Sequence, residues 1–428
     1  MLRILAILMS LALTGCAVGF SLAPPPNLYR SGENYPANDV AVSLRTAAPK
    51  IFYVTDRTRA GESYNATRSQ EMAFGHATVR FGRDLEWAEL LERTRADSEQ
   101  NISTLWVQEI QEVVRFPSTP LPFQRVNDRL VTLPDAQAAY DAQTRAFQDN
   151  LRTQLKAAGT GRVLVYIHGF NNAFEDGVTT LANIWHFAGR DAVPVAFTWP
   201  SGNGVGPLGY FRDRDSGMFS VFHTKQFLRM VAGMPEVDQI DIIAHSQGTA
   251  VATTALRELI IEQRGSGRHP REAMKTHTLI MAAPDLDTGV VGQRLLAERF
   301  AEGFHQINLY LNPDDVALRV SRILTGQARL GAVTEVDFQP GVIESLQKQA
   351  RVHLIRVENV RAAAGHSYFR QNPAVLSDIV LALRTGAFPG DAARPLEAEP
   401  SGMWALHSNY PLERLREVEF ELGQSRKR

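Results

Sequence analysis

Residues 244–248 read Ala-His-Ser-Gln-Gly, so a serine stands with small residues two positions before and two positions after it. The apolar run 240–243 precedes this pattern and a helix-forming stretch, 249–261, follows it, which predicts a strand, a sharp turn and a helix. The small residues let the strand and helix backbones approach closely. Because such a turn strains the serine backbone and exposes the side-chain oxygen, the pattern predicts that the Ser246 hydroxyl is a nucleophile.

A serine hydroxyl needs a base to take its proton, and the base needs a third group to orient it. Where a serine stands on such a turn, the acid and then the histidine follow it along the chain. The candidate bases are His269, His277, His305, His353 and His366. The first stands in a loop between a helix and a strand, and the next three fall within or at the edge of predicted strands. His366 alone occupies a loop after the last predicted strand, so we assign the base to it.

Two pairs of aspartates, Asp285 with Asp287 and Asp314 with Asp315, follow predicted strands. The second pair follows the penultimate strand, which is the usual position of the acid. Within it Asp315 is favoured, because Asp314 follows a proline and could cap the next helix. Asp285 or Asp287 would be the acid in an alternative arrangement, although a turn or a helix cap is the commoner role for aspartates placed there.

Acyl transfer also needs hydrogen-bond donors for the developing oxyanion. One donor is normally the backbone N–H of the residue after the nucleophile, here Gln247. The second is expected in the turn after the strand at 163–167, which reads His-Gly-Phe-Asn-Asn over 168–172. We expect the Phe170 N–H to be this donor, while His168 has the structural role of a hydrogen-bonding side chain.

Strands and helices alternate along the chain, which predicts an α/β fold with a mostly parallel central sheet and helices on both faces. Asp135 is expected to cap a helix that Gly159 ends. The glycine-rich segment 202–217 is expected to be a loop, either a lid or acyl-pocket wall over the site or a flexible surface loop. The expected strands are 51–55, 77–81, 163–167, 193–198, 240–243, 278–281, 306–311 and 352–357, and further helices are expected at 174–187, 219–231 and near 373.

The first residues have the pattern of a bacterial lipoprotein signal. A short basic start precedes the apolar run 4–13, which is too short to span a bilayer, and Leu-Thr-Gly-Cys over 13–16 resembles a lipobox. Cys16 is the only cysteine, so no disulfide framework is possible and the thiol stands where a lipid acceptor is needed. We expect a lipid anchor on the periplasmic side of the cell envelope. The alternative is an ordinary cleaved signal peptide with an incidental cysteine.

Five segments are therefore expected. They are a signal peptide (1–15), a proline-containing tether (16–49), a strand-containing N-terminal extension (50–158), the catalytic core (159–385) and an irregular C-terminal extension (386–428).

The composition and motifs give no indication of a nucleic-acid partner, a metal or another cofactor. There are 45 basic and 46 acidic side chains, which gives a formal net charge of −1 and no basic stripe for nucleic acid. No His-Glu-x-x-His pattern or cysteine cluster indicates a metal, and no glycine-rich phosphate cradle is present.

The chain resembles an α/β-hydrolase family of unknown function, of the esterase/lipase-superfamily type, over roughly residues 50 to 385. The resemblance implies a serine hydrolase and supports Asp315 as the acid that joins Ser246 and His366, but the family supplies no settled substrate. The expected small-molecule ester or lipid substrate is suggested by the lipid anchor. The alternative is a catalytically silent scaffold that serves as an envelope interaction protein; the presence of all three residues argues against it. The matching segments are 52–57, 165–171, 197–201, 244–248, 283–285, 315–318 with 321–322, and 365–368.

Overall fold

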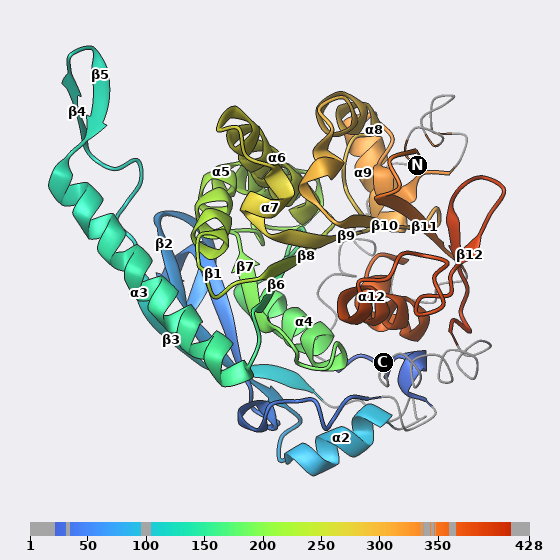
Figure 1. The fold of residues 1–428 in the computed structure, drawn as a ribbon. Helices are drawn as coiled ribbons and strands as arrows, with labels where there is room; N and C mark the ends of the chain where they lie inside the picture. The colour runs from blue at the N-terminus through green and yellow to red at the C-terminus, as the bar shows by residue number, and fades with distance from the viewer. Residues whose placement is uncertain are drawn as a thin grey trace.

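An eleven-stranded sheet runs through the protein, with its strands in the order β12-β13-β11-β10-β9-β8-β6-β7-β1-β2-β3 (Figure 1). The computed structural model describes residues 22–30, 35–95, 104–334, 348–358 and 365–411, with a few single positions between 335 and 347. From β13 to β1 neighbouring strands are parallel, whereas β2, β3 and β12 pair antiparallel at the two edges. The α/β fold expected from the sequence is confirmed.

The strands of this sheet are β1 (Lys50–Ala60), β2 (Ser63–Phe81), β3 (Leu105–Arg115), β6 (Arg162–Ile167), β7 (Val193–Thr198), β8 (Gln239–His245), β9 (Thr276–Ala282), β10 (Gln306–Leu311), β11 (Val352–Val357), β12 (Glu397–Ala398) and β13 (Trp404–Leu406). The helices are α2 (Trp87–Arg95), α3 (Pro134–Ala158), α4 (Phe174–Phe187), α5 (Gly206–Ala232), α6 (Gly248–Gly265), α7 (Pro270–Met274), α8 (Thr288–Val290), α9 (Val316–Thr325), α11 (Tyr368–Gln371) and α12 (Pro373–Thr385). A π-helical segment, η4 (Val291–Leu296), continues α8, and 3-10 turns η5 (Phe300–Gly303) and η6 (Leu330–Ala332) lie nearby.

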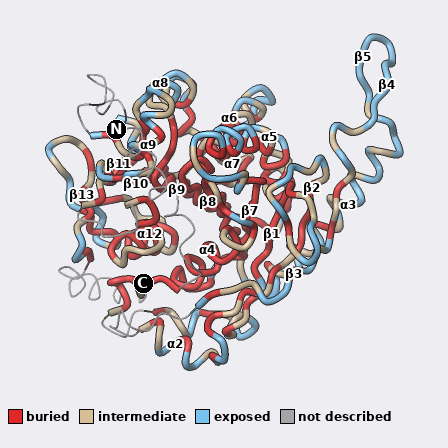
Figure 2. Tube along the Cα trace, turned by 180° about the vertical axis from the view of Figure 1, so that it is seen from behind, coloured by how far each residue is buried: buried red, intermediate tan, exposed pale blue. Residues whose placement is uncertain are grey.

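Both faces of the sheet are covered, because successive side chains of each strand point to opposite sides. In β6, Leu164 and Tyr166 join the apolar core under α4 and α12, whereas Val163 and Val165 join the core under α3, α5 and α6. The central strands are buried almost without interruption (Figure 2). This pattern is typical of parallel strands with helices on both sides.

The glycine-rich segment differs from the expected loop. Residues 206–217 belong to α5, which continues unbroken from Gly206 to Ala232. Glycine is accepted here because the helix lies close to its surroundings: a Cβ on Gly209 would come within 1.9 Å of the Gly204 carbonyl oxygen. The Gly217 Cβ position lies 3.0 Å from the side chain of Val251 in α6. Close packing therefore outweighs the weak helix propensity of glycine.

The segment 16–49 was expected to be a tether, but the part of it that the structure describes packs against the rest of the protein. Leu28 and Tyr29 are buried in the core under α12, and the Asn27 side-chain amide donates to the carbonyl oxygens of Ser408 and Tyr410. The segment from 386 onwards is not merely irregular, since it adds β12 and β13 to the sheet and β13 pairs parallel with β11. The proposed signal peptide and Cys16 lie outside the described residues.

A hairpin of β4 (Phe123–Val126) and β5 (Arg129–Thr132) projects beyond the end of α3, away from the sheet (Figure 1). The helix begins at Pro134, so Asp135 lies in its first turn and is not the cap, while Gly159 ends it at φ 65° as expected. Among the helices that the structure describes, none combines the length and apolar content of a membrane span.

Candidate active site

The strand, turn and helix around Ser246 form as the sequence predicts. Strand β8 ends at His245, α6 begins at Gly248, and Ser246 between them has φ 52°, a left-handed conformation that is rare for a side-chain-bearing residue. A Cβ at Gly248 would lie 2.2 Å from the carbonyl oxygen of His168. The elbow therefore needs glycine at this position so that its helix can pack on the end of β6.

Asp315 and His366 meet at the carboxyl end of the sheet. The Nδ1 atom of His366 lies 2.7 Å from Oδ2 of Asp315, and both side chains are buried. Because a carboxylate only accepts, the ring donates Nδ1–H and keeps Nε2 for another partner. Burial disfavours the protonated ring, but the charge and hydrogen bond of Asp315 outweigh it and raise the pKa of His366 above its usual value. This is the arrangement of a base and its orienting acid.

The remaining aspartates have other partners. Asp285 accepts hydrogen bonds from Tyr210 and Ser321 and forms an ion pair with Arg329 at 3.4 Å. Asp287 caps α8 by accepting from the Val290 N–H, and Asp314 is an exposed side chain paired with Arg319. Only Asp315, among these four, contacts His366.

The two histidines that flank the site are structural. The His168 ring stacks on Trp199 at 5.1 Å, and burial together with the nearby Arg57 charge lowers the pKa of His168 to about 3. The His245 ring stacks on Phe369 at 4.4 Å and packs beside His366, with ring centroids 4.8 Å apart. Burial and the neighbouring His366 keep the pKa of His245 well below its usual value.

The turn after β6 is anchored by the N–H groups of Asn171 and Asn172. The Asn171 N–H donates to Asp213 and the Asn172 N–H donates to the Ser201 hydroxyl. Among the described residues, neither the Phe170 N–H nor the Gln247 N–H donates to another protein atom. A Cβ on Gly169 would lie 2.8 Å from Ser246 Cβ, so the turn is in contact with the elbow. Two backbone donors of this kind are what an oxyanion hole requires.

Arg57, on β1, holds this turn and was not expected from the sequence to have a role. Its guanidinium is buried and donates to the carbonyl oxygens of Asn172 at 2.8 Å and Ser201 at 3.0 Å. It also lies 3.3 Å from His168 Nε2. Burial lowers the pKa of Arg57 only to about 10, so the group stays charged at neutral pH. The second half of β1 is polar and charged, so the sequence did not indicate that Arg57 is buried; the only signal was that the family-like segment 52–57 ends on this arginine.

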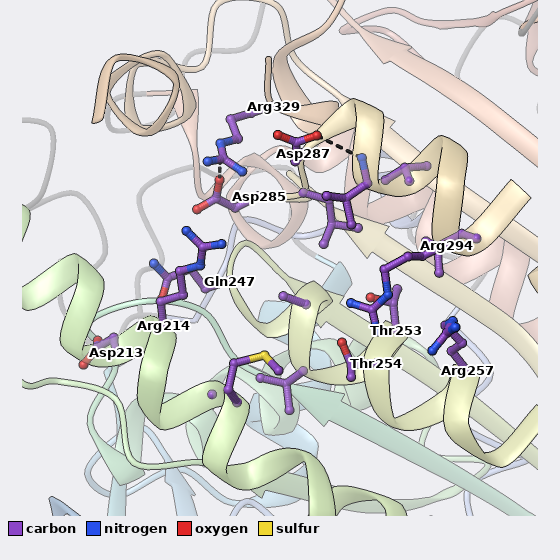
Figure 3. A pocket seen from close by; sticks show the side chains of 18 of the residues that line it. Asp213, Arg214, Gln247, Thr253, Thr254, Arg257, Asp285, Asp287, Arg294 and Arg329 are labelled. Atoms are coloured by element: carbon purple, nitrogen blue, oxygen red, sulfur yellow. Dashed lines mark hydrogen bonds and ion pairs between the residues drawn. The ribbon is translucent and has the colours of Figure 1, made fainter. Parts of the chain in front are cut away.

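A solvent-open cavity of about 860 Å³ adjoins the elbow, and Figure 3 shows the side chains around it. Gln247, directly after Ser246, contributes to its wall, and the Asp285 N–H donates to the Ser246 carbonyl at 3.3 Å. The first turns of α5 form one side through Tyr210, Asp213 and Arg214. The segment was expected to be a lid or acyl-pocket wall, or else a flexible surface loop; from Gly206 onwards it is helical and forms one wall of the cavity.

The described residues contain no group of three or more His, Cys, Asp or Glu side chains that could hold a metal ion.

A mostly parallel sheet, helices on both faces and a strand–turn–helix elbow define an α/β-hydrolase scaffold. A family model described as an alpha/beta hydrolase of unknown function (DUF900) matches residues 143–384, more than half of the chain, and the protein belongs to this family. The resemblance stated from the sequence is thereby confirmed. A comparison with curated proteins found no match.

Proposed function

We propose that the protein is a serine hydrolase that cleaves carboxylic esters through an acyl-enzyme on Ser246. The observation that carries this proposal is the Asp315–His366 hydrogen bond, formed at the same sheet edge as the strained elbow. A buried, acid-paired imidazole next to a strained serine turn is costly for a scaffold without chemistry. The residues also follow the order serine, acid, histidine.

In this proposal the Ser246 oxygen attacks the ester carbonyl carbon while His366 Nε2 takes the hydroxyl proton. The carbonyl oxygen becomes an oxyanion, which the N–H groups of Phe170 and Gln247 stabilise. When the intermediate collapses, the carbon–oxygen bond to the alcohol breaks and His366 returns its proton to the leaving alkoxide. A water molecule, deprotonated by His366, then attacks the acyl-enzyme and releases the carboxylic acid and free Ser246.

Labelling with a fluorophosphonate probe tests this function directly, because the probe reacts with activated serines. The full-length protein in mild detergent should be labelled, and should hydrolyse short and medium p-nitrophenyl esters, while Ser246→Ala should do neither. Ser220→Ala, a buried serine of α5 whose hydroxyl donates to a helix carbonyl, is the control. Absence of both Ser246-dependent labelling and hydrolysis would favour a silent scaffold with an interaction role instead.

We also propose that Cys16 receives a lipid and holds the protein on the periplasmic side of a bacterial membrane. The lipobox-like residues 13–16 support this proposal. In a bacterial host, Cys16→Ser should lose metabolic labelling by an alkyne fatty acid and leave the detergent-extracted membrane fraction. Retention of both by the variant would contradict the proposal.

A further inference from the structure

Four arginines from four different segments line the cavity beside the elbow. They are Arg214 on α5, Arg257 on α6, Arg294 on η4 and Arg329 just before η6. Figure 3 shows Arg214 and Arg294 reaching into the space from opposite sides. Segments far apart in the chain thus bring cationic groups together at one place.

Two of these arginines are already neutralised. Arg257 forms an ion pair with Glu298, and Arg329 forms one with Asp285. In the described part of the chain, Arg214 and Arg294 have no carboxylate within ion-pair distance. Their charges are therefore available to a ligand.

The three acidic residues of the cavity wall have protein partners other than Arg214 and Arg294. The Asp213 carboxylate accepts from the N–H groups of Asn171, Gly202 and Asn203. Asp287 caps α8, and Asp285 is held by Tyr210, Ser321 and Arg329. Each carboxylate is held by protein donors, and none of them forms an ion pair with Arg214 or Arg294, so these two guanidinium groups can still pair with an anion.

Most of the remaining wall is apolar, and the same cavity reaches Gln247, the residue after Ser246. Its apolar side chains come from α5, α6 and η4 and from the segments that follow β7 and β9; they include Trp199, Met218, Val251, Leu286, Val291 and Leu295. A wholly polar ligand would leave this surface unused, and a wholly apolar one would bury two guanidinium groups without a partner. The lining fits a molecule with an alkyl portion and an anionic end.

We propose that the substrate is an anionic amphiphile: an ester whose alkyl portion lies on the apolar wall and whose carboxylate or phosphate pairs with Arg214 and Arg294. The choice of ester as substrate rests on the function proposed above, whereas the binding of the anion does not. Arginine suits this task because its planar fork pairs with either anion through two hydrogen bonds.

Matched substrates of equal shape test the proposal. p-Nitrophenyl hydrogen adipate places a carboxylate on the acyl side, and p-nitrophenyl methyl adipate is its neutral counterpart. The hexanoate esters of 4-hydroxybutyrate and of butanol form a second pair, with the charge on the alcohol side. We expect at least one anionic substrate to have a kcat/KM about 10-fold or more above its neutral partner, because a charged hydrogen bond contributes about 1.5–3 kcal/mol. High salt should reduce this ratio.

Substitution of the arginines tests whether they cause the preference for the anionic substrate. Arg294→Gln and Arg214→Gln should each lower kcat/KM for the anionic substrate more than for its neutral partner, so that the ratio of the two falls. Arg212→Gln is the control, since Arg212 is an exposed arginine of the same helix that does not line the cavity. Equal kcat/KM for both members of both pairs, with Ser246-dependent hydrolysis intact, would overturn this inference and leave the proposed function standing.

A binding measurement separates the two proposals if no ester is hydrolysed. Hexyl phosphate and hexanoate, titrated calorimetrically into Ser246→Ala, should bind more tightly than hexanol. Adding Arg294→Gln should reduce the difference, and adding both Arg214→Gln and Arg294→Gln should abolish it. The stronger of the two anions indicates whether a phosphate or a carboxylate is preferred. Anion binding without hydrolysis would overturn only the esterase function, and equal binding of all three would overturn the anion site.

Discussion

The two carboxylate oxygens of Asp315 hold two different parts of the protein: Oδ2 accepts from His366 Nδ1 at 2.7 Å while Oδ1 accepts from the Leu318 N–H at 3.0 Å. The second bond caps α9, so the helix fixes the orientation of the carboxylate that orients the histidine. Helix capping and support of the base, treated as competing roles when Asp314 and Asp315 were compared in the sequence, are combined in one residue.

Asp315→Asn tests this pairing. The amide would favour the wrong histidine tautomer and lose the charge that stabilises the imidazolium, so we expect kcat/KM to fall by about 10³–10⁴-fold. The exposed neighbour Asp314, changed to Asn, should leave the rate near that of the wild type. The measurement is kcat/KM for ester hydrolysis. If Asp285→Asn were inactive and Asp315→Asn fully active, Asp285 would be the acid instead of Asp315.

The pH dependence of the reaction follows from the raised pKa of His366. The base must be neutral, so activity is lost as pH falls through this pKa, and the acidic limb of kcat/KM should lie above about 6.5, the usual value for histidine. Since protonated His366 is favoured in the folded state, its contribution to stability is present at low pH and disappears as pH rises through the raised pKa. A limb at or below the usual value would show that Asp315 does not support the base.

Gly248→Ala should disrupt the elbow. The new methyl group would lie 2.2 Å from the His168 carbonyl oxygen and 2.7 Å from that of Ile167, and neither backbone can move without disturbing β6. We expect a loss of about 1–3 kcal/mol in the free energy of unfolding, together with loss of activity. Gly265→Ala, at the far end of the same helix, meets nothing within 4 Å and is the matched control in urea unfolding.

Arg57 is expected to act as a positioning residue. Arg57→Met would release the carbonyl oxygens of Asn172 and Ser201 and loosen the turn that bears the Phe170 N–H. The loss should fall on kcat rather than KM, by about 10²-fold, because an oxyanion donor acts on the transition state. Arg57→Lys should recover part of the rate, and Arg59→Met on the same strand should retain it. A uniform rise in KM alone would argue against this role.

The sequence predicted well those parts of the fold that local patterns govern. Helix α4 and strand β7 begin and end where they were expected, at Phe174–Phe187 and Val193–Thr198. Apolar runs bounded by turns determine such elements, so neighbouring residues are sufficient to predict them. The elbow could also be predicted from neighbouring residues, since its small residues and its flanking strand and helix are contiguous in the sequence.

Tertiary contacts determine what the sequence did not predict. The start of α5 looks like a loop in isolation, but it is helical, and its Gly217 packs closely against Val251 of α6. In the sequence Arg57 resembles an ordinary surface charge. In the structure it donates to a carbonyl oxygen of the turn after β6. In the sequence Leu28 and Tyr29 look like part of a tether, whereas in the structure they are buried in the core under α12. In each case the deciding partner lies far away in the chain.

Arg57 lies on β1, which pairs with β7 and lies outside residues 143–384. The portion that defines family membership therefore does not include the strand that pairs with β7, nor the arginine that holds the turn after β6. A shortened protein limited to that portion would present β7 as a bare edge, open to pairing with other chains. We therefore expect an autonomously folding unit of this scaffold to include β1, which begins at Lys50.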